Sequence, residues 1–288
     1  MTQTIRLGIS TCPNDTFAFH GLLTRAVDWR GLDFAVDLLD IQELNDRLRA
    51  GSFDIAKASF HAALQLANEY VVLPSGSALG FGVGPLLLAA QPDTRPCDPD
   101  QLTLLPGRDT TAALLFHLFH PDSTRVEQVV FSEIMPRLQA GTADFGACIH
   151  EGRFTWQQQG LFLVEDMGTR WEEATKSPLP LGGIVASRQL ASETVSAVQQ
   201  VIHDSLQVAL ADRAAAIPTM RRYAQEFDDA VLMQHVDLYV NEWTLDLGDV
   251  GCKALAALST QAAAAGIGTG RPIEIYRHEQ PKRPMHRL

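Results

Sequence analysis

Four short segments of this sequence place polar side chains where apolar, strand-like runs end. They are STCPNDTF (10–17), KASFHAAL (57–64), PGRDTTA (106–112) and ACIHEGRFT (147–155). In open α/β sheets, ligands bind beyond the carboxyl ends of the strands, where the N-termini of helices point. All four segments fit that placement, so we expect them to contribute to one ligand site.

The first two segments have residue types that suit binding of an anion. Asn14, Asp15 or Thr16 can cap a helix that we expect to start near Asp15, which leaves backbone N–H groups for an anion; a plain helix cap is the simpler alternative. Lys57 lies near the end of an apolar strand, and Ser59 precedes the next helix. The pattern leaves open whether Lys57 points to solvent or pairs with a carboxylate across a cleft.

The third segment is expected to be a strand at Leu102–Leu105, a turn and then a helix. Thr110 and Thr111 at the start of that helix offer two hydroxyls and two N–H groups to a carboxylate. Alternatively, Asp109 is the N-cap and the threonines have no role in binding.

The histidines allow two kinds of site. His150 ends an apolar strand among polar neighbours, and an imidazole in a cleft suits a general base; a histidine bonded to loop backbone is the alternative. His117 and His120 have the helical spacing of a metal pair, but no third ligand candidate accompanies them, so we expect two core histidines and no metal site. Cys12 has no histidine near it in sequence and is not expected to be a nucleophile.

The elements that carry these segments alternate between strand and helix. The pattern predicts strands at 5–10, 34–39 and 53–58 and helices from about 15, at 42–50 and at 61–69. Such alternation predicts βαβ units and a largely parallel sheet.

An internal repeat indicates two lobes of similar construction. RLRAGSFDIAKASF (47–60) matches RLQAGTADFGACIH (137–150), with Leu, Ala, Gly and Asp at a constant offset. Each copy predicts a helix that ends at a C-cap glycine, a tight turn with an aspartate and a short apolar strand.

Two further segments bear on the lobes. SGSALGFGVGP (75–85) has glycines without a following helix, which is wrong for a dinucleotide loop and suits backbone passing close to a ligand or flexing at a lobe crossing. We expect the chain to return to the first lobe at residues 181–187, within PLPLGGIVAS (178–187), and to end in helices and a loose basic tail. The predicted limits are residues 1–89 and 187–288 for a large lobe and 90–186 for a small one.

The composition excludes several classes of protein. Among 288 residues, 46% are hydrophobic and 20% charged, as in ordinary globular proteins, and the net charge of −11 argues against a nucleic-acid partner. No stretch approaches the roughly 20 apolar residues of a membrane span, and the start has no export signal. The four cysteines show no CxxC pair, so reduced thiols and a cytoplasmic location are expected.

Taken together, STCPNDTF, DIAKASFHA, SGSALGFGVGP, PGRDTTA, ACIHEGRFT and PLPLGGI resemble the 1,4-dihydroxy-6-naphthoate synthase family of the futalosine route to menaquinone. The resemblance implies a type II periplasmic-binding-protein-like clamshell, an α/β fold of two lobes joined by two crossovers with the substrate between them. It implies a carbon–carbon lyase that converts cyclic dehypoxanthinyl futalosine, a small carboxylate, to 1,4-dihydroxy-6-naphthoate, with no cofactor. The oligomeric state is not implied.

The resemblance also assigns residues. The family's catalytic base falls on His150, and its substrate-binding positions fall on Lys57, Ala58, Ser59, Thr110 and Thr111. Asn14, Asp15, Ser75 and Gly76 match motifs that line the cleft.

Two positions depart from the family's pattern. Asp109 stands where an aromatic residue or histidine is frequent, and Phe81 where a polar or basic residue is frequent. The added charge next to a carboxylate site requires that Asp109 turn away as a cap, or that the ligand be oriented differently.

Two alternatives share the fold, which by itself does not determine function. One is a solute-binding protein for an organic anion. The other is a sibling enzyme of the same pathway, such as the chorismate dehydratase.

Overall fold

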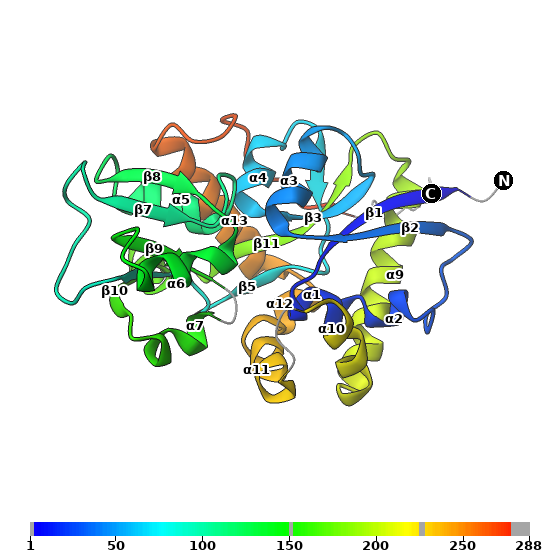
Figure 1. The fold of residues 1–288 in the computed structure, drawn as a ribbon. Helices are drawn as coiled ribbons and strands as arrows, with labels where there is room; N and C mark the ends of the chain where they lie inside the picture. The colour runs from blue at the N-terminus through cyan, green and yellow to red at the C-terminus, as the bar shows by residue number, and fades with distance from the viewer. Residues whose placement is uncertain (1–2, 150–151, 225–227, 278–288) are drawn as a thin grey trace.

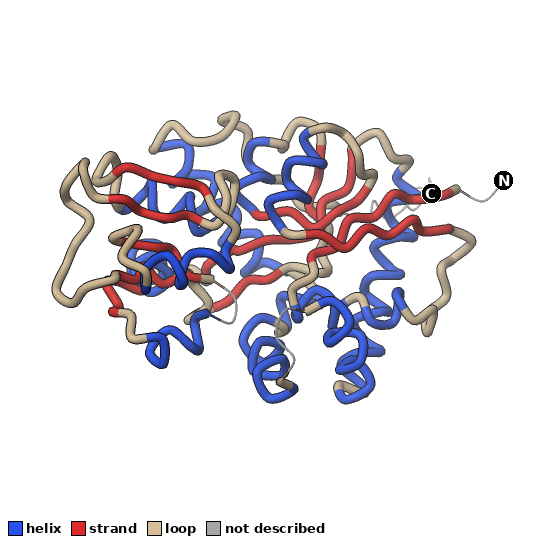
Figure 2. The backbone as a smooth tube through the Cα atoms, in the orientation of Figure 1, coloured by secondary structure: helices blue, strands red, loops and turns tan. Residues whose placement is uncertain are grey.

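Two twisted sheets with helices packed around them make up the molecule (Figures 1 and 2). A computed structural model of the chain describes residues 3–149, 152–224 and 228–277. The mixed α/β architecture with two sheets confirms the predicted fold class. No helix in these ranges is both long and apolar enough to cross a membrane.

The first sheet has the strand order β2-β1-β3-β11-β4, with β5 also paired to β11. Its strands are β1 Thr4–Ser10, β2 Asp33–Leu39, β3 Ile55–Ser59, β4 Tyr70–Val72, β5 Ala78–Gly80 and β11 Leu179–Ser187. The pairs β1·β2 and β1·β3 are parallel, as the βαβ pattern predicted, whereas β11 is antiparallel to its three partners. The long strand β11 enters this sheet from the second half of the molecule, as expected from the PLPLGGIVAS segment.

The second sheet has the order β10-β6-β9-β7-β8. Its strands are β6 Leu86–Ala89, β7 Leu102–Leu105, β8 Arg125–Gln128, β9 Phe145–Cys148 and β10 Phe162–Asp166. Here β7 runs parallel to β8 and β9, and β6 is antiparallel to β9. The central strands of both sheets therefore have one parallel and one antiparallel neighbour.

Helices cover both sheets and fill the seam between them. They are α1 Pro13–Ala18, α2 His20–Leu23, α3 Ile41–Arg49, α4 Phe60–Gln65, α5 Thr111–Phe119, α6 Phe131–Gln139, α7 Gly152–Thr155, α8 Met167–Thr175, α9 Ser192–Ala211, α10 Ile217–Tyr223, α11 Asp229–Tyr239, α12 Glu242–Leu245 and α13 Gly248–Ala264. One apolar core continues from α3 and α4 across the seam to α5, α8 and α13. The part of the molecule built on the first sheet and the part built on the second sheet, which we call the first and second halves, are therefore packed against each other.

The two copies of the internal repeat have the predicted structure. Helices α3 and α6 end just before Gly51 and Gly141, whose φ values of 70° and 67° are in the left-handed region that glycine adopts without strain. The amides of Asp54 and Asp144 then donate to a strand carbonyl of their own sheet, at Arg6 and Leu102 respectively, both at 3.0 Å. The repeat therefore builds equivalent frames in the two sheets.

The prediction for the first helix was wrong at its start. Helix α1 begins at Pro13 and not near Asp15, and its N-cap is Cys12, which makes no side-chain cap hydrogen bond. A proline at the first position of a helix loses no hydrogen bond and has a suitable φ. Asn14, Asp15 and Thr16 consequently lie inside the helix and do not cap it.

Sheet membership changes twice along the chain, between β5 and β6 and between β10 and β11. The first crossing passes close to the start of α8: a Cβ built on Gly84 would lie 2.1 Å from the Cα of Gly168. Only glycine fits there, in agreement with backbone passing a tight crossing. The lobe limits at 89/90 and 186/187 stay a prediction.

The closing segment is partly attached, which corrects the expectation of a loose tail for residues 271–277. Val72 of β4 donates to the carbonyl of Glu274, and Tyr276 donates back to Val72 at 2.7 Å. Arg188 forms an ion pair with Glu274 at 2.8 Å. An extended piece of chain is thereby fixed at the edge of the first sheet.

Candidate active site

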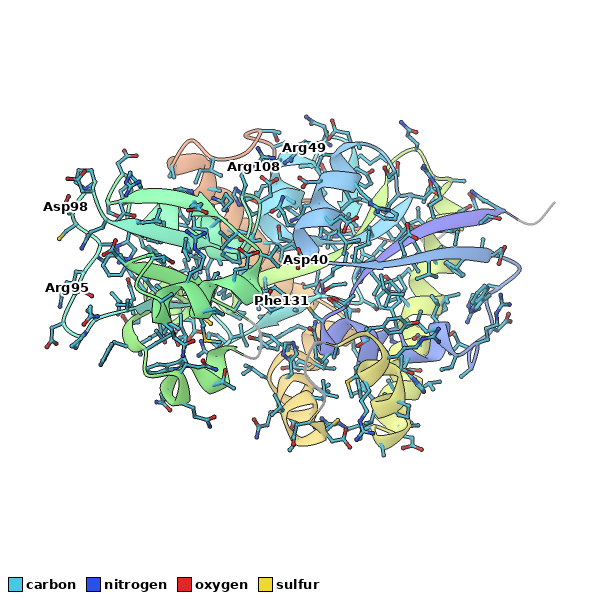
Figure 3. The ribbon with its side chains drawn as sticks, viewed as in Figure 1. Asp40, Arg49, Arg95, Asp98, Arg108 and Phe131 are labelled. Carbon is cyan, nitrogen blue, oxygen red and sulfur yellow. The ribbon has the colours of Figure 1, made fainter. Side chains whose placement is uncertain are left out.

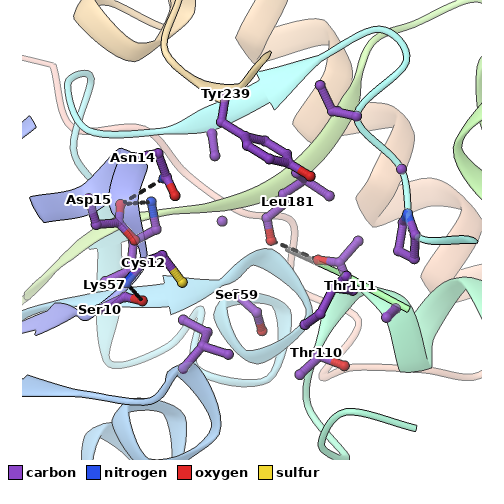
Figure 4. A pocket seen from close by; sticks show the side chains of 18 of the residues that line it. Ser10, Cys12, Asn14, Asp15, Lys57, Ser59, Thr110, Thr111, Leu181 and Tyr239 are labelled. Atoms are coloured by element: carbon purple, nitrogen blue, oxygen red, sulfur yellow. Dashed lines mark hydrogen bonds and ion pairs between the residues drawn. The ribbon is translucent and has the colours of Figure 1, made fainter. Parts of the chain in front are cut away.

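A cavity of about 120 Å³ lies at the seam, where ends of strands and helices from both sheets meet (Figure 4). Six of the residues predicted for the site are among those that line it: Asn14, Asp15, Lys57, Ser59, Thr110 and Thr111. These residues come from three of the four sequence segments. Figure 4 shows Asn14, Asp15 and Lys57 on one side of the cavity and Thr110 and Thr111 on the other.

Lys57 is buried and paired. Its side chain is 5% exposed, as is that of Asp15, and the Nζ to Oδ1 distance is 2.6 Å. Lys57 also donates to the carbonyl of Gly76 at 3.1 Å. An ammonium group has three donors, so one remains for a ligand once these two bonds are made.

The buried pair belongs to a longer chain of polar contacts. Asn14 donates to the Asp15 carboxylate at 3.2 Å. Asn14 in turn accepts from Nε2 of His235, on α11, at 3.0 Å. The network connects β3 of the first sheet with a helix more than 170 residues later in the chain.

The paired threonines open α5 as predicted, but Thr110 and not Asp109 is the N-cap. The Thr110 hydroxyl accepts from the amide of Ala113 and donates to the carbonyl of Gly107 at 2.8 Å. The Thr111 hydroxyl donates to the carbonyl of Leu181 on β11 at 2.7 Å. Both hydroxyls are therefore already used as donors, and the first-turn amides of Thr111 and Ala112, which have no acceptor within the helix, are the donors available to an anion.

Asp109 does not line the cavity, and the expectation that it caps α5 was wrong, because Thr110 is the N-cap. Its carboxylate lies 2.9 Å from the guanidinium of Arg49 on α3. Burial would raise the pKa of this carboxyl, but the adjacent guanidinium of Arg49 more than offsets it, so the pKa lies below its ordinary value. The residue is ionised and does not add an unpaired negative charge to the cavity.

The remaining predicted binding residues do not line the cavity. Ala58 is fully buried and pairs with Gly183 in the sheet. Ser75 donates to the carbonyl of Leu245 at 2.6 Å and accepts from Gln199. Gly76 contributes only the carbonyl that Lys57 contacts.

His150 lies outside the described residues, so its predicted role as a base remains a prediction. Its neighbour Ile149 lines the cavity. Two residues beyond Glu151, Arg153 donates to the carbonyl of Gly84 and forms an ion pair with Asp166 at 2.8 Å. The described residues on both sides of His150 are thus attached to the cavity wall and to the crossing segment.

Two cavity residues on α11 were missed in the sequence. His235 and Tyr239 are one helical turn apart, and their rings lie 4.5 Å from each other. Burial raises the pKa of the Tyr239 phenol, so it stays protonated. Nothing in the apolar pattern of α11 marks these residues as cavity-facing, because their position depends on how the helix packs on the first sheet.

Cys12 also lines the cavity. Burial and the neighbouring Asp15 carboxylate raise the pKa of the Cys12 thiol, so the thiolate is disfavoured. The expectation that Cys12 is no nucleophile stays a prediction.

The expectation for the pair on α5 was wrong. His117 is exposed, and His120 lies 2.7 Å from Glu165 on β10, so neither is a core histidine. The buried face of α5 ends at Phe116. Within the described ranges, no cluster of three or more His, Cys, Asp or Glu residues has an arrangement that could hold a metal ion.

Comparison with known proteins identifies a family that matches this chain. The profile of a family described as menaquinone biosynthesis matches residues 5–264. A 1,4-dihydroxy-6-naphthoate synthase of Thermus thermophilus is 38% identical over 274 residues, which cover 95% of this chain and 99% of the relative. The corresponding enzyme of Streptomyces coelicolor is 39% identical, with 92% and 95% covered.

Solved structures show the same fold. A crystal structure of a protein from Archaeoglobus fulgidus superimposes with a TM-score of 0.85 at 28% identity and covers 91% of this chain and 98% of that one. The alkanesulfonate-binding protein SsuA of Xanthomonas axonopodis, bound to MOPS, has a TM-score of 0.66 at 12% identity, with 95% and 98% covered. The second likeness confirms the predicted periplasmic-binding-protein-like clamshell.

Proposed function

This chain belongs to the menaquinone biosynthesis family, and from that membership we propose that it is a 1,4-dihydroxy-6-naphthoate synthase with His150 as its general base. The two curated relatives that carry this name match nearly the full length of the chain, so the activity of a whole enzyme is transferred and not that of a fragment. The substrate is cyclic dehypoxanthinyl futalosine, and the reaction breaks a carbon–carbon bond.

The cavity at the seam carries the proposal. It brings a buried lysine from the first sheet and the start of α5 from the second half to the same space, and Ile149, next to His150, lines it. In the proposed mechanism, His150 takes a proton from the substrate and starts a retro-aldol-like fragmentation. Formation of an aromatic ring drives the fragmentation. A positioned base contributes typically about 10²–10⁴-fold to the rate.

The substrate carboxylate is proposed to lie at the first turn of α5. The amides of Thr111 and Ala112 and the positive end of the helix dipole favour an anion there. The third donor of Lys57 and the protonated hydroxyl of Tyr239 are further partners. In this assignment Thr110 shapes the turn, and Asn14 and Asp15 hold Lys57 in place.

The predicted binding residues that do not line the cavity are assigned a supporting role. Ala58 keeps β3 in register with β11, and the Gly76 carbonyl holds the Lys57 ammonium. Ser75 ties the glycine-rich segment to the C-terminal helices through Leu245 and Gln199.

We propose that the substrate enters when the two halves part. A cavity of about 120 Å³ is close to the size that holds one benzene ring, which is smaller than a fused-ring substrate with a sugar-derived portion. Closure then removes water from the reacting atoms and orients them against the base. Orientation adds to the effect of the base on the rate.

The partner, cofactor and location are part of the proposal. The partner is a small carboxylate, the reaction needs no cofactor, and the enzyme works in the cytoplasm. Turnover that survives exhaustive dialysis against a metal chelator supports the second point. Fractionation of cells with an antibody against the chain tests the third.

Incubation of the purified protein with cyclic dehypoxanthinyl futalosine, followed by mass spectrometry of the products, tests the activity. His150→Ala is expected to lower turnover by at least about 10²-fold and to leave substrate binding largely intact. His117→Ala is the matched control, because His117 is exposed on α5 and does not line the cavity.

The alternatives predict different outcomes of the same experiment. Tight binding without conversion indicates a binding protein, and conversion of chorismate in its place indicates the sibling enzyme. Turnover of the His150→Ala variant near that of the unaltered protein removes His150 from the mechanism.

A further inference from the structure

Asp109 contacts the opposite half of the molecule with its side chain. It lies between β7 of the second sheet and α5, and its carboxylate is 2% exposed. One oxygen lies 2.9 Å from Arg49 of α3, and the other accepts from Gln65 of α4 at 3.1 Å. Helices α3 and α4 both pack on the first sheet, so these contacts cross the seam.

The main chain of Asp109 is held from the same side. Its amide donates to the side chain of Gln42 at 3.2 Å, and its carbonyl accepts from the hydroxyl of Ser59 and, at 3.5 Å, from Asn45. The next carbonyl, that of Thr110, accepts from His61 at 3.1 Å. The amide, carbonyl and carboxylate of a single residue therefore all have partners in the other half.

A second charge pair reinforces the contact. Arg108 lies 3.9 Å from Asp46 of α3 and 3.8 Å from Asp109. Figure 3 shows Arg49 and Arg108 close together on the face where α3 approaches the β7–α5 turn. We call Asp109, Gln42, Arg49 and Gln65 the seam clamp.

The seam clamp holds the segment that carries the proposed binding groups. Thr110 and Thr111 follow Asp109 directly, and the amides of Thr111 and Ala112 are the available donors at the cavity. We propose that Asp109 is a positioning residue, which docks the start of α5 onto the first half when the molecule closes and so completes the carboxylate site. The ligand named here rests on the proposed function.

The chemistry of the seam clamp makes it reversible. The Arg49 side chain is 37% exposed, so water can solvate both charges once the halves part. A fully buried pair, in contrast, would resist opening because each charge would leave its partner in a dry environment. Asp109 therefore favours the closed state without locking it.

The test measures closure and kinetics separately. Asp109→Asn and Arg49→Met each weaken the clamp from one side of the seam, and the double variant Asp109→Arg with Arg49→Asp restores an opposite-charge pair. Glu127→Gln is the control, because Glu127 pairs with Arg137 on the surface of the second half and does not cross the seam. Small-angle X-ray scattering of the ligand-free proteins reports closure, and steady-state kinetics report KM and kcat.

We expect the two single variants to have a larger radius of gyration than the unaltered protein and a KM raised by about tenfold, because the binding-competent state is less populated. The kcat is expected to change by less than about threefold, since saturating substrate still closes the molecule. The charge-reversed double variant should recover most of the KM, and Glu127→Gln should change neither quantity.

Two results overturn the inference. One is an unchanged radius of gyration with an unchanged KM in both single variants. The other is a loss of kcat and of thermal stability without any change in the radius, which indicates a structural role alone. Failure of the proposed function is distinguishable, because the unaltered protein would then not convert the substrate while the scattering comparison still decides whether Asp109 favours closure.

Discussion

The two copies of the repeat have the same helix–turn–strand backbone, which we call the frame, but differ in the residues at the end of the strand. In each copy a helix, α3 or α6, stops at a left-handed glycine, and an aspartate then joins the following strand to its neighbour. Strand β3 ends in Lys57, Ala58 and Ser59, all buried, and brings a charge to the cavity. Strand β9 ends in Ala147 and Cys148 and is followed by Ile149, which supplies an apolar wall. The frame positions residues, and the few residues after it determine their chemistry.

Removal of the Lys57 charge, which the second copy does not have, should have the largest effect on the free energy of unfolding. Lys57→Met leaves the Asp15 carboxylate buried without its charged partner, so we expect the free energy of unfolding to fall by about 3–5 kcal/mol. Chemical denaturation measures the change. The double variant Lys57→Met with Asp15→Leu should recover most of that stability but not the turnover; a double variant as unstable as the single one would show that the pair itself stabilises the fold.

Equivalent core leucines should show that the two frames are alike. Leu48 of α3 and Leu138 of α6 are each 1% exposed and pack on their own sheet. Each Leu→Ala change is expected to lower the free energy of unfolding by about 3 kcal/mol, because a cavity replaces a buried side chain. Urea denaturation of both variants makes the comparison, and costs that differ by more than about twofold would contradict the equivalence of the frames.

Substitution of the two turn aspartates should distinguish the hydrogen bond that both copies make from the ion pair that only the first copy makes. Asp54 accepts from the Arg6 amide at 2.9 Å, as Asp144 does from the Leu102 amide at 2.8 Å, but Asp54 alone also forms an ion pair with the Arg6 guanidinium. Asp144→Ala should cost about 1 kcal/mol for the lost hydrogen bond, and Asp54→Ala up to about 1 kcal/mol more for the surface pair.

The extra cost at Asp54 should depend on pH. Burial would raise the pKa of Asp54, but the hydrogen bonds and charge of Arg6 more than offset it and lower the pKa. A lowered pKa in the folded state stabilises the protein above the unfolded value, near about 3.9, and this contribution is lost as the pH falls through the folded value. The difference in free energy of unfolding between the unaltered protein and Asp54→Ala should therefore narrow as the pH falls below about 4. A difference that stays constant there would exclude the ion pair as the source of the extra cost.

The smallest expected effect is at the two turn glycines. A Cβ on Gly51 or Gly141 meets no atom within 4 Å, so alanine there costs only the strain of a left-handed backbone, about 1 kcal/mol. The costs of Gly51→Ala and Gly141→Ala, read from thermal unfolding, should agree within error. Unequal losses of stability would mean that the two turns differ in backbone strain in spite of their similar φ values.

The sequence predicted what depends on local pattern. Apolar runs marked β1, β2, β3 and β7, and the spacing of leucine, glycine and aspartate marked the repeat, because each element can be recognised from a few adjacent residues. The start of α1 was missed because a proline can either occupy the first position of a helix, as Pro13 does, or end a helix, and the local sequence does not distinguish the two.

What the sequence could not predict depends on contacts between distant segments. His235 and Tyr239 reach the cavity only through the packing of α11 on the first half, and their pattern is that of any amphipathic helix. The orientation of Asp109 depends on Arg49 and Gln65, which are more than 40 residues away. The residues next to a side chain in the sequence do not show whether that side chain has a polar partner across the seam.

The insertion of β11 between β3 and β4 has a consequence for synthesis on the ribosome. The second sheet uses strands from 86–166 alone, whereas the first sheet stays incomplete until residues 179–187 have emerged and joined β3 to β4. The later-starting sheet can thus finish first, and the nascent chain presents an unpaired β3 edge in the meantime. We expect that a chain truncated shortly before residue 179 would leave that edge open to pairing with another chain.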